Sequence, residues 1–204
     1  PDLDVTARTP GGAINVSGLT GALDLNVMGG SVTAERLEGF IRIRGSGGAL
    51  TVQESTGLSL DLEWSAGPVR LQEIEGETTT LRARAASTTL HDIHGPVDLS
   101  VDGAPLELRD VDGPCEARVQ GSTLTYHGAP THETSLTVVG GHLSTNLPPT
   151  HDAELMVTGS TVALDDAFAF NGEQTSKHIE GTLNGGGPRL RLRAVRGTAT
   201  CTPQ

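Results

Sequence analysis

Four acidic side chains recur at near-equal intervals along the middle of the sequence. They stand 18 or 19 residues apart and are Glu54, Glu73, Asp92 and Asp110. If equivalent strands stack about 4.8 Å apart, these carboxylates form one column in which like charges repel each other. Hard cations such as Ca²⁺ bind several carboxylate oxygens, so this acidic ladder is a candidate calcium site. The alternative is a water-exposed acidic corner that keeps the protein soluble.

The remaining residues offer little other chemistry. The sequence has no D-x-D-x-D-G calcium loop, no G-x-S-x-G elbow, no H-E-x-x-H pair and no phosphate-binding loop. His91 and His127 share one repeat position but lie two repeats apart, on the order of 10 Å, so we interpret them as surface histidines. Cys115 falls at an inward position and Cys201 lies several repeats away, which predicts inert thiols without a disulfide between them. We expect no catalytic residues, and no cofactor beyond calcium at the acidic ladder.

Composition separates the chain from several functional classes. Its 204 residues include 25 acidic and 14 basic side chains, for a net charge of −11. A surface that follows nucleic acid or anionic lipid needs clustered Lys and Arg, so we expect no nucleic-acid partner. No apolar run approaches the roughly 18 residues of a membrane span, which predicts no transmembrane segment in this sequence. The low aromatic content, 2%, and the 27 glycines favour a thin aliphatic core.

A repeat of 18 or 19 residues runs through most of the chain. Each copy has a small residue followed by apolar residues two, four and usually seven positions later, as in Gly30, Val32, Ala34 and Leu37. Alternation with period two is typical of strands that bury one face, and repeats of this length stack to bury their open faces. The small residues that open this second arm are Gly12, Gly30, Gly48, Gly67, Ala86, Ala104, Ser122, Gly141 and Ser160. The sequence predicts an all-β fold, a single-stranded β-helix or solenoid that forms one domain over residues 1–204.

A second set of alternating apolar positions forms the first arm of each coil, for example over residues 97–101. In this register the inward positions before and after Trp64 are Gly45 and Ala83. A large ring needs space in a closely packed core. We therefore expect the two small residues to lie on either side of the tryptophan.

The repeat lapses near the end of the chain. Residues 168–187 lack the pattern and are predicted to form an irregular insertion. The pattern resumes with Leu190, Leu192 and Val195, which follow the second-arm spacing counted from Pro188.

The two ends of a solenoid are exposed strand edges that need covering. The candidates for this role are residues 1–10 at one end and residues 168–187 near the other. If neither segment covers an end, we expect two molecules to associate end to end through the open edge.

The repeated corners also carry a resemblance. The corners are LEG at 37–39, IEG at 74–76, IHG at 93–95 and VDG at 111–113, and the chain closes with GGGPRLRLRAVRG at 185–197. Together they resemble a bacterial family of β-strand-repeat, adhesin-like proteins of unknown function, which is similar to adhesin head domains and more distantly to bactofilins. The resemblance implies a right-handed β-helix in an envelope-associated or extracellular protein. Its motifs are structural and imply no active-site residues.

These features favour a non-catalytic structural or interaction module of the bacterial cell envelope or surface, whose partner is a protein or a polysaccharide. Outward charges that meet on neighbouring coils, such as Arg42 and Asp61, fit a role in fixing strand register. The alternative is a carbohydrate-active β-helix enzyme or a polysaccharide-binding protein, because such enzymes also carry charged side chains on a parallel sheet. A groove with paired carboxylates would favour the enzyme.

Overall fold

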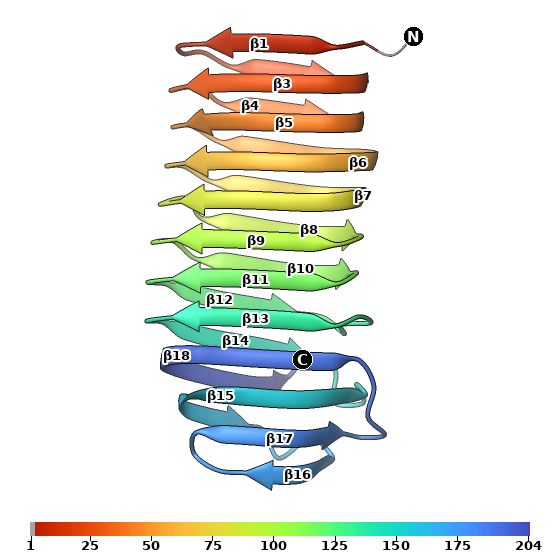
Figure 1. The fold of residues 1–204 in the computed structure, drawn as a ribbon, viewed down its shortest axis with the longest axis vertical. Helices are drawn as coiled ribbons and strands as arrows, with labels where there is room; N and C mark the ends of the chain where they lie inside the picture. The colour runs from red at the N-terminus through yellow and green to blue at the C-terminus, as the bar shows by residue number, and fades with distance from the viewer. Residues whose placement is uncertain (1–2) are drawn as a thin grey trace.

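The chain folds into a tall stack of coils built from β-strands (Figure 1). The computed structural model describes residues 3–204, within which no helix could span a bilayer. The strands are β1 (Val5–Thr9), β2 (Ile14–Ser17), β3 (Thr20–Met28), β4 (Val32–Glu35), β5 (Glu38–Ser46), β6 (Leu50–Ser65), β7 (Val69–Arg84), β8 (Thr88–His94), β9 (Val97–Asp102), β10 (Leu106–Asp112), β11 (Cys115–Gln120), β12 (Thr123–His127), β13 (Thr134–Val139), β14 (His142–Leu147), β15 (Ala153–Leu164), β16 (Phe170–Gln174), β17 (His178–Leu183) and β18 (Arg189–Pro203).

Each coil has two arms that lie on opposite sides of a thin core. Strands of one arm pair in parallel with the same arm of the next coil, so that Ile41 of β5 lies opposite Leu23 of β3 and Leu60 of β6. The first-arm sheet contains β1, β3, β5, β9, β11, β13 and parts of β6, β7, β15 and β18. The second-arm sheet contains β2, β4, β8, β10, β12, β14 and the other parts of those long strands.

The architecture confirms the predicted all-β solenoid with coils of 18 or 19 residues. In Figure 1 the front strands from β1 to β13 run to the left and the strands behind them run to the right as the chain descends. A path that turns in this sense while it descends is right-handed, as the resemblance implied.

Trp64 fills the core where its neighbours are small. Its side chain is 2% exposed, and the residues opposite it are Gly45 and Ala83. A Cβ atom on Gly45 would lie 2.3 Å from Cζ3 of the indole ring, so the ring occupies the space that a larger residue would need. The predicted first-arm register is confirmed.

The strand β18 breaks the sequential order of the coils. It lies between the coil of β13 and β14 and the coil of β15, and it pairs in parallel with all three strands (Figure 1). Leu190 and Leu192 consequently belong to the first-arm sheet, where Leu192 faces Leu136, and the second-arm placement predicted from Pro188 is wrong. Both arms alternate with period two, so the spacing alone could not tell them apart. The small residue that opens the second arm of this coil is Gly197, which lies against Gly141.

The hairpin of β16 and β17 covers the C-terminal end of the stack. Residues 168–187, expected to be irregular, form two antiparallel strands, and β17 pairs antiparallel with the first arm of β15. Phe168, 5% exposed, packs into the core beside this hairpin. The segment therefore covers the end by pairing its exposed edge.

The N-terminal end is built differently. Residues 5–9 form β1, a strand of the first coil, so the part of residues 1–10 that the structure describes is no separate cap. Within residues 3–204, no strand pairs with the outer edge of β1 or β2. The inward side chains at this end, including Val5 and Ile14, are only partly buried.

Candidate functional site

The acidic ladder occupies a corner at which the backbone is left-handed. The φ angles of Glu54, Glu73, Asp92 and Asp110 lie between 51° and 57°, and Gly18, Arg36 and Gly128 hold the same corner in other coils with positive φ. Positive φ is uncommon for residues other than glycine, and aspartate is one of those that tolerate it best. Backbone geometry and exposure to water thus restrict which residues suit this corner.

Each acid of the ladder lies near a basic or polar side chain. The pairs are Arg36 with Glu54 at 3.7 Å, Gln72 with Glu73 at 2.9 Å, His94 with Asp92 at 3.1 Å and His91 with Asp110 at 3.8 Å. No group of three or more His, Cys, Asp or Glu side chains among residues 3–204 is placed to hold a metal ion. Calcium binding at this corner stays a prediction.

A cluster beside the ladder contains two histidines that the repeat analysis did not single out. The Asp112 carboxylate accepts a hydrogen bond from the Thr131 hydroxyl and lies 3.5 Å from ring nitrogens of His94 and His132. The Thr131 hydrogen bond holds the pKa of Asp112 below its ordinary value of 3.8, and the two histidines lower the pKa further. His94 and Asp112 occupy equivalent positions in neighbouring coils. This alignment is the signal in the sequence that could have placed the two side chains together.

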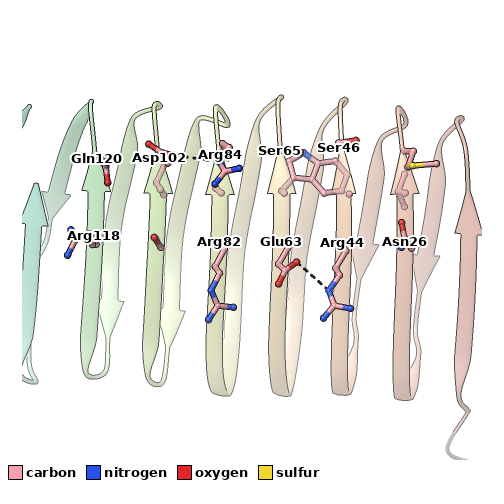
Figure 2. A pocket seen from close by; sticks show the side chains of 17 residues that line it. Asn26, Arg44, Ser46, Glu63, Ser65, Arg82, Arg84, Asp102, Arg118 and Gln120 are labelled. Carbon is pink, nitrogen blue, oxygen red and sulfur yellow. Dashed lines mark ion pairs between the residues drawn. The ribbon is translucent and has the colours of Figure 1, made fainter. Parts of the chain in front are cut away.

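A long hollow crosses the first-arm sheet on its outer side (Figure 2). It measures about 660 Å³ and runs over β3, β5, β6, β7, β9 and β11, between two columns of outward side chains. Its charged lining consists of four arginines and two carboxylates: Arg44, Arg82, Arg84, Arg118, Glu63 and Asp102. This basic trough contrasts with the acidic character of the chain.

One of the two columns carries an arginine on every second coil. Strand pairing places Arg8, Asn26, Arg44, Glu63, Arg82, Ser100, Arg118, Thr137 and Arg193 opposite one another in that order. We call Arg8, Arg44, Arg82, Arg118 and Arg193 the arginine column. The repeat alone aligns Arg44, Arg82 and Arg118, but sequence analysis interpreted these outward charges as register pairs. Only Arg193 joins the column through the insertion of β18.

Ion pairs between neighbouring coils, which fix the strand register, account for only some of the outward charges on this sheet. Arg42 pairs with Asp61 at 3.0 Å and Arg44 with Glu63 at 3.5 Å, as the interpretation of the outward columns predicted. Glu63 turns toward Arg44 and away from Arg82 (Figure 2). Four arginines of the column, namely Arg8, Arg82, Arg118 and Arg193, are exposed and have no carboxylate of residues 3–204 within 4.0 Å.

The two carboxylates of the trough stand apart. Glu63 and Asp102 are separated by two coils and two residues along the strand, roughly 12 Å between backbone positions. Each points to its own arginine, Arg44 at 3.5 Å and Arg84 at 3.7 Å. Glycosidases that use two carboxylates hold them about 5 to 9.5 Å apart, so the trough does not present that arrangement.

A second, smaller hollow brings carboxylates closer together. It measures about 470 Å³, and Asp98, Glu116 and Glu133 are among the residues that line it. Asp98 and Glu116 face each other on neighbouring strands, about 4.8 Å apart. Both side chains are exposed, whereas the catalytic acid of a glycosidase is sheltered in an apolar pocket.

The cysteines are core residues. Cys115 and Cys201 are both free and buried, which confirms that they form no disulfide. Burial raises the pKa of the Cys115 thiol to about 12 and that of Cys201 to about 11. Neither thiol suits nucleophilic catalysis, which requires an accessible thiolate.

Comparisons with protein-family models, curated proteins and solved structures find no match for this chain.

Proposed function

We propose that this protein is a non-catalytic interaction module of the bacterial cell envelope or surface. It presents ladders of outward side chains to an extended macromolecule, a polysaccharide or a protein. The observation that carries the proposal is the basic trough, which follows the stack of coils across six strands of an uncovered sheet. Sites for small molecules instead enclose most of their ligand. The adhesin-like corners support the envelope location.

A screen against purified envelope polysaccharides and proteins tests this function. We expect saturable binding without the release of new reducing or unsaturated sugar ends. Release of such ends, abolished by replacing one surface carboxylate, would overturn the non-catalytic assignment. Cell fractionation with an antibody against the protein tests the location, and recovery only in the cytosol would contradict it.

The facing carboxylates of the smaller hollow support a second candidate, a carbohydrate-active enzyme. Asp98 and Glu116 lie opposite each other on neighbouring strands, whose backbones are about 4.8 Å apart, close to the roughly 5 Å between the two carboxyl groups of a retaining glycosidase. Glu116→Gln and Asp98→Asn variants test this candidate in the same sugar-end assay. A wild-type activity that both substitutions abolish would favour the enzyme.

The proposal includes self-association through the N-terminal end of the stack. The β16–β17 hairpin covers one end of the stack, whereas the outer edges of β1 and β2 lack strand partners within residues 3–204. Two copies related by a two-fold axis could pair these edges antiparallel, and the closed contact would stop at a dimer. Light scattering coupled to size exclusion tests this, since a ladder of larger oligomers would exclude a closed dimer.

A further inference from the structure

We infer that the basic trough binds a linear anionic polysaccharide that carries one acidic sugar for every two coils. The acid groups of the ligand lie along the arginine column. This inference rests on the proposed function and names the ligand class of that surface.

The spacing of the arginine column sets the spacing of the charges on the ligand. Successive arginines lie two coils apart, roughly 9.6 Å if strands are 4.8 Å apart. An extended disaccharide has a comparable length, so a chain with one carboxylate per disaccharide places each acid beside an arginine. A polymer with an acid on every sugar would place half of its charges at the intervening coils, which hold no arginine in this column and one of which carries Glu63.

The side chains of the column are free to bind such a ligand. Arg82, Arg118 and Arg193 are exposed and, within residues 3–204, unpaired with any carboxylate. The planar fork of arginine binds a carboxylate through two parallel hydrogen bonds. Between these arginines lie Ser100 and Thr137, whose hydroxyl groups can exchange hydrogen bonds with sugar hydroxyls.

The neighbouring column favours a thin ligand over a broad polyanion. Two residues earlier along the same strands lie Asp61, Asp98 and Glu116, about 7 Å from the arginine column. Duplex nucleic acid carries one charge per roughly 1.7 Å of its axis and is wide enough to cover both columns, so its phosphates would meet these carboxylates. A single polysaccharide chain can follow the column from Arg82 to Arg193, where only Ser100 and Thr137 lie between the arginines, without crossing the acids.

Calorimetric titration at low ionic strength tests the inference on the wild-type protein. The probes are oligosaccharides of alternating glucuronic acid and N-acetylglucosamine, oligogalacturonate with an acid on every sugar, inorganic polyphosphate and neutral dextran. We expect the alternating oligosaccharide to bind most tightly and its affinity to rise once its length reaches from one arginine to the next. Added salt should weaken the binding, because exposed charges are screened.

Matched variants locate the site. The double variant Arg82→Ser/Arg118→Ser should lower the affinity by at least about tenfold, since each contact to a charged group contributes roughly threefold to tenfold. Arg70→Ser removes the same charge as the single variant Arg82→Ser, but from the second-arm sheet, where Arg70 is exposed between Thr51 and Thr89. It should leave the affinity unchanged, whereas Arg82→Ser should lower it. Thermal unfolding checks that all variants are folded.

Four results would overturn the inference. Tighter binding of oligogalacturonate or polyphosphate than of the alternating chain would refute the two-coil spacing. An equal loss of affinity in Arg70→Ser would refute the location. An affinity independent of oligosaccharide length would refute the two-coil spacing on the wild-type protein alone. Binding of dextran or of an envelope protein without any anionic oligosaccharide would refute the ligand class while leaving the proposed interaction module intact.

Discussion

Replacing Gly45 with alanine should destabilise the solenoid by pressing on Trp64. The added Cβ would lie 2.3 Å from Cζ3 and 2.9 Å from Cε3 of the indole ring, and 2.8 Å from the Val27 carbonyl oxygen. The ring is enclosed, at 2% exposure, so neighbouring atoms must shift to admit the methyl group. Overfilling a packed core typically costs about 1 to 3 kcal/mol. In a chain of 204 residues this corresponds to a fall in melting temperature of roughly 2 to 12 °C.

Urea unfolding followed by tryptophan fluorescence and far-UV circular dichroism measures this loss. Trp64 is the single tryptophan, so its emission reports on the core directly. The control is Gly185→Ala, whose Cβ would meet only Asp152 Oδ1 at an ordinary 3.5 Å and should change the free energy of unfolding by less than about 0.5 kcal/mol.

A double-mutant cycle separates the two obstacles around Gly45. In the Trp64→Leu background, Gly45→Ala should cost less free energy of unfolding, because the indole ring is gone and only the Val27 carbonyl remains close. An equal cost in both backgrounds would identify the carbonyl as the obstacle. Wild-type stability of Gly45→Ala itself would refute the packing argument.

If calcium binds the acidic ladder, the melting temperature should be modestly higher in millimolar calcium than in chelator, since an ion bound only by the folded state stabilises it. Equal melting temperatures at matched ionic strength would contradict calcium binding and favour the alternative, a water-exposed acidic corner. Cys115 and Cys201, with pKa values raised to about 12 and about 11, should resist alkylation at pH 8 in the native protein and react in urea, so rapid native labelling would contradict their burial. The lowered pKa of Asp112 means that its carboxylate stabilises the fold above pH 3.8, and that this stability is lost as the pH falls through the folded-state value. Asp112→Asn should therefore flatten the decline in melting temperature as the pH falls below 3.8, and an unchanged pH profile would count against this role.

Local patterns were enough to predict the coils and much of their register. Alternation with period two tells which side chains point inward, and the small corner residues tell where each arm begins. The placement of Trp64 between Gly45 and Ala83 followed from these signals alone. It was correct because each coil before the C-terminal end stacks on its predecessor, so alignment in sequence equals alignment in space.

The C-terminal end could not be predicted in the same way. A parallel strand pairs with whichever edge is available, and nothing in the alternation of Leu190 and Leu192 says that β18 fits between β14 and β15. The place of Arg193 in the arginine column could not be predicted for the same reason, because Arg193 faces Thr137 only through that insertion. The repeat spacing was enough to identify the acidic ladder. It could not identify the histidines beside the ladder, because their contacts depend on the directions of side chains at a corner, which the spacing does not specify.

The insertion of β18 also has a consequence for synthesis on the ribosome. Earlier coils can stack as they emerge, but the edges of β13 and β14 receive their neighbour only when Arg189–Pro203 has been made, 56 residues after β14 ends. At roughly 5 to 20 residues per second, these edges wait several seconds for their partner. During that interval they are open to a second nascent chain or to a chaperone, so co-translational misassembly should concentrate at this junction.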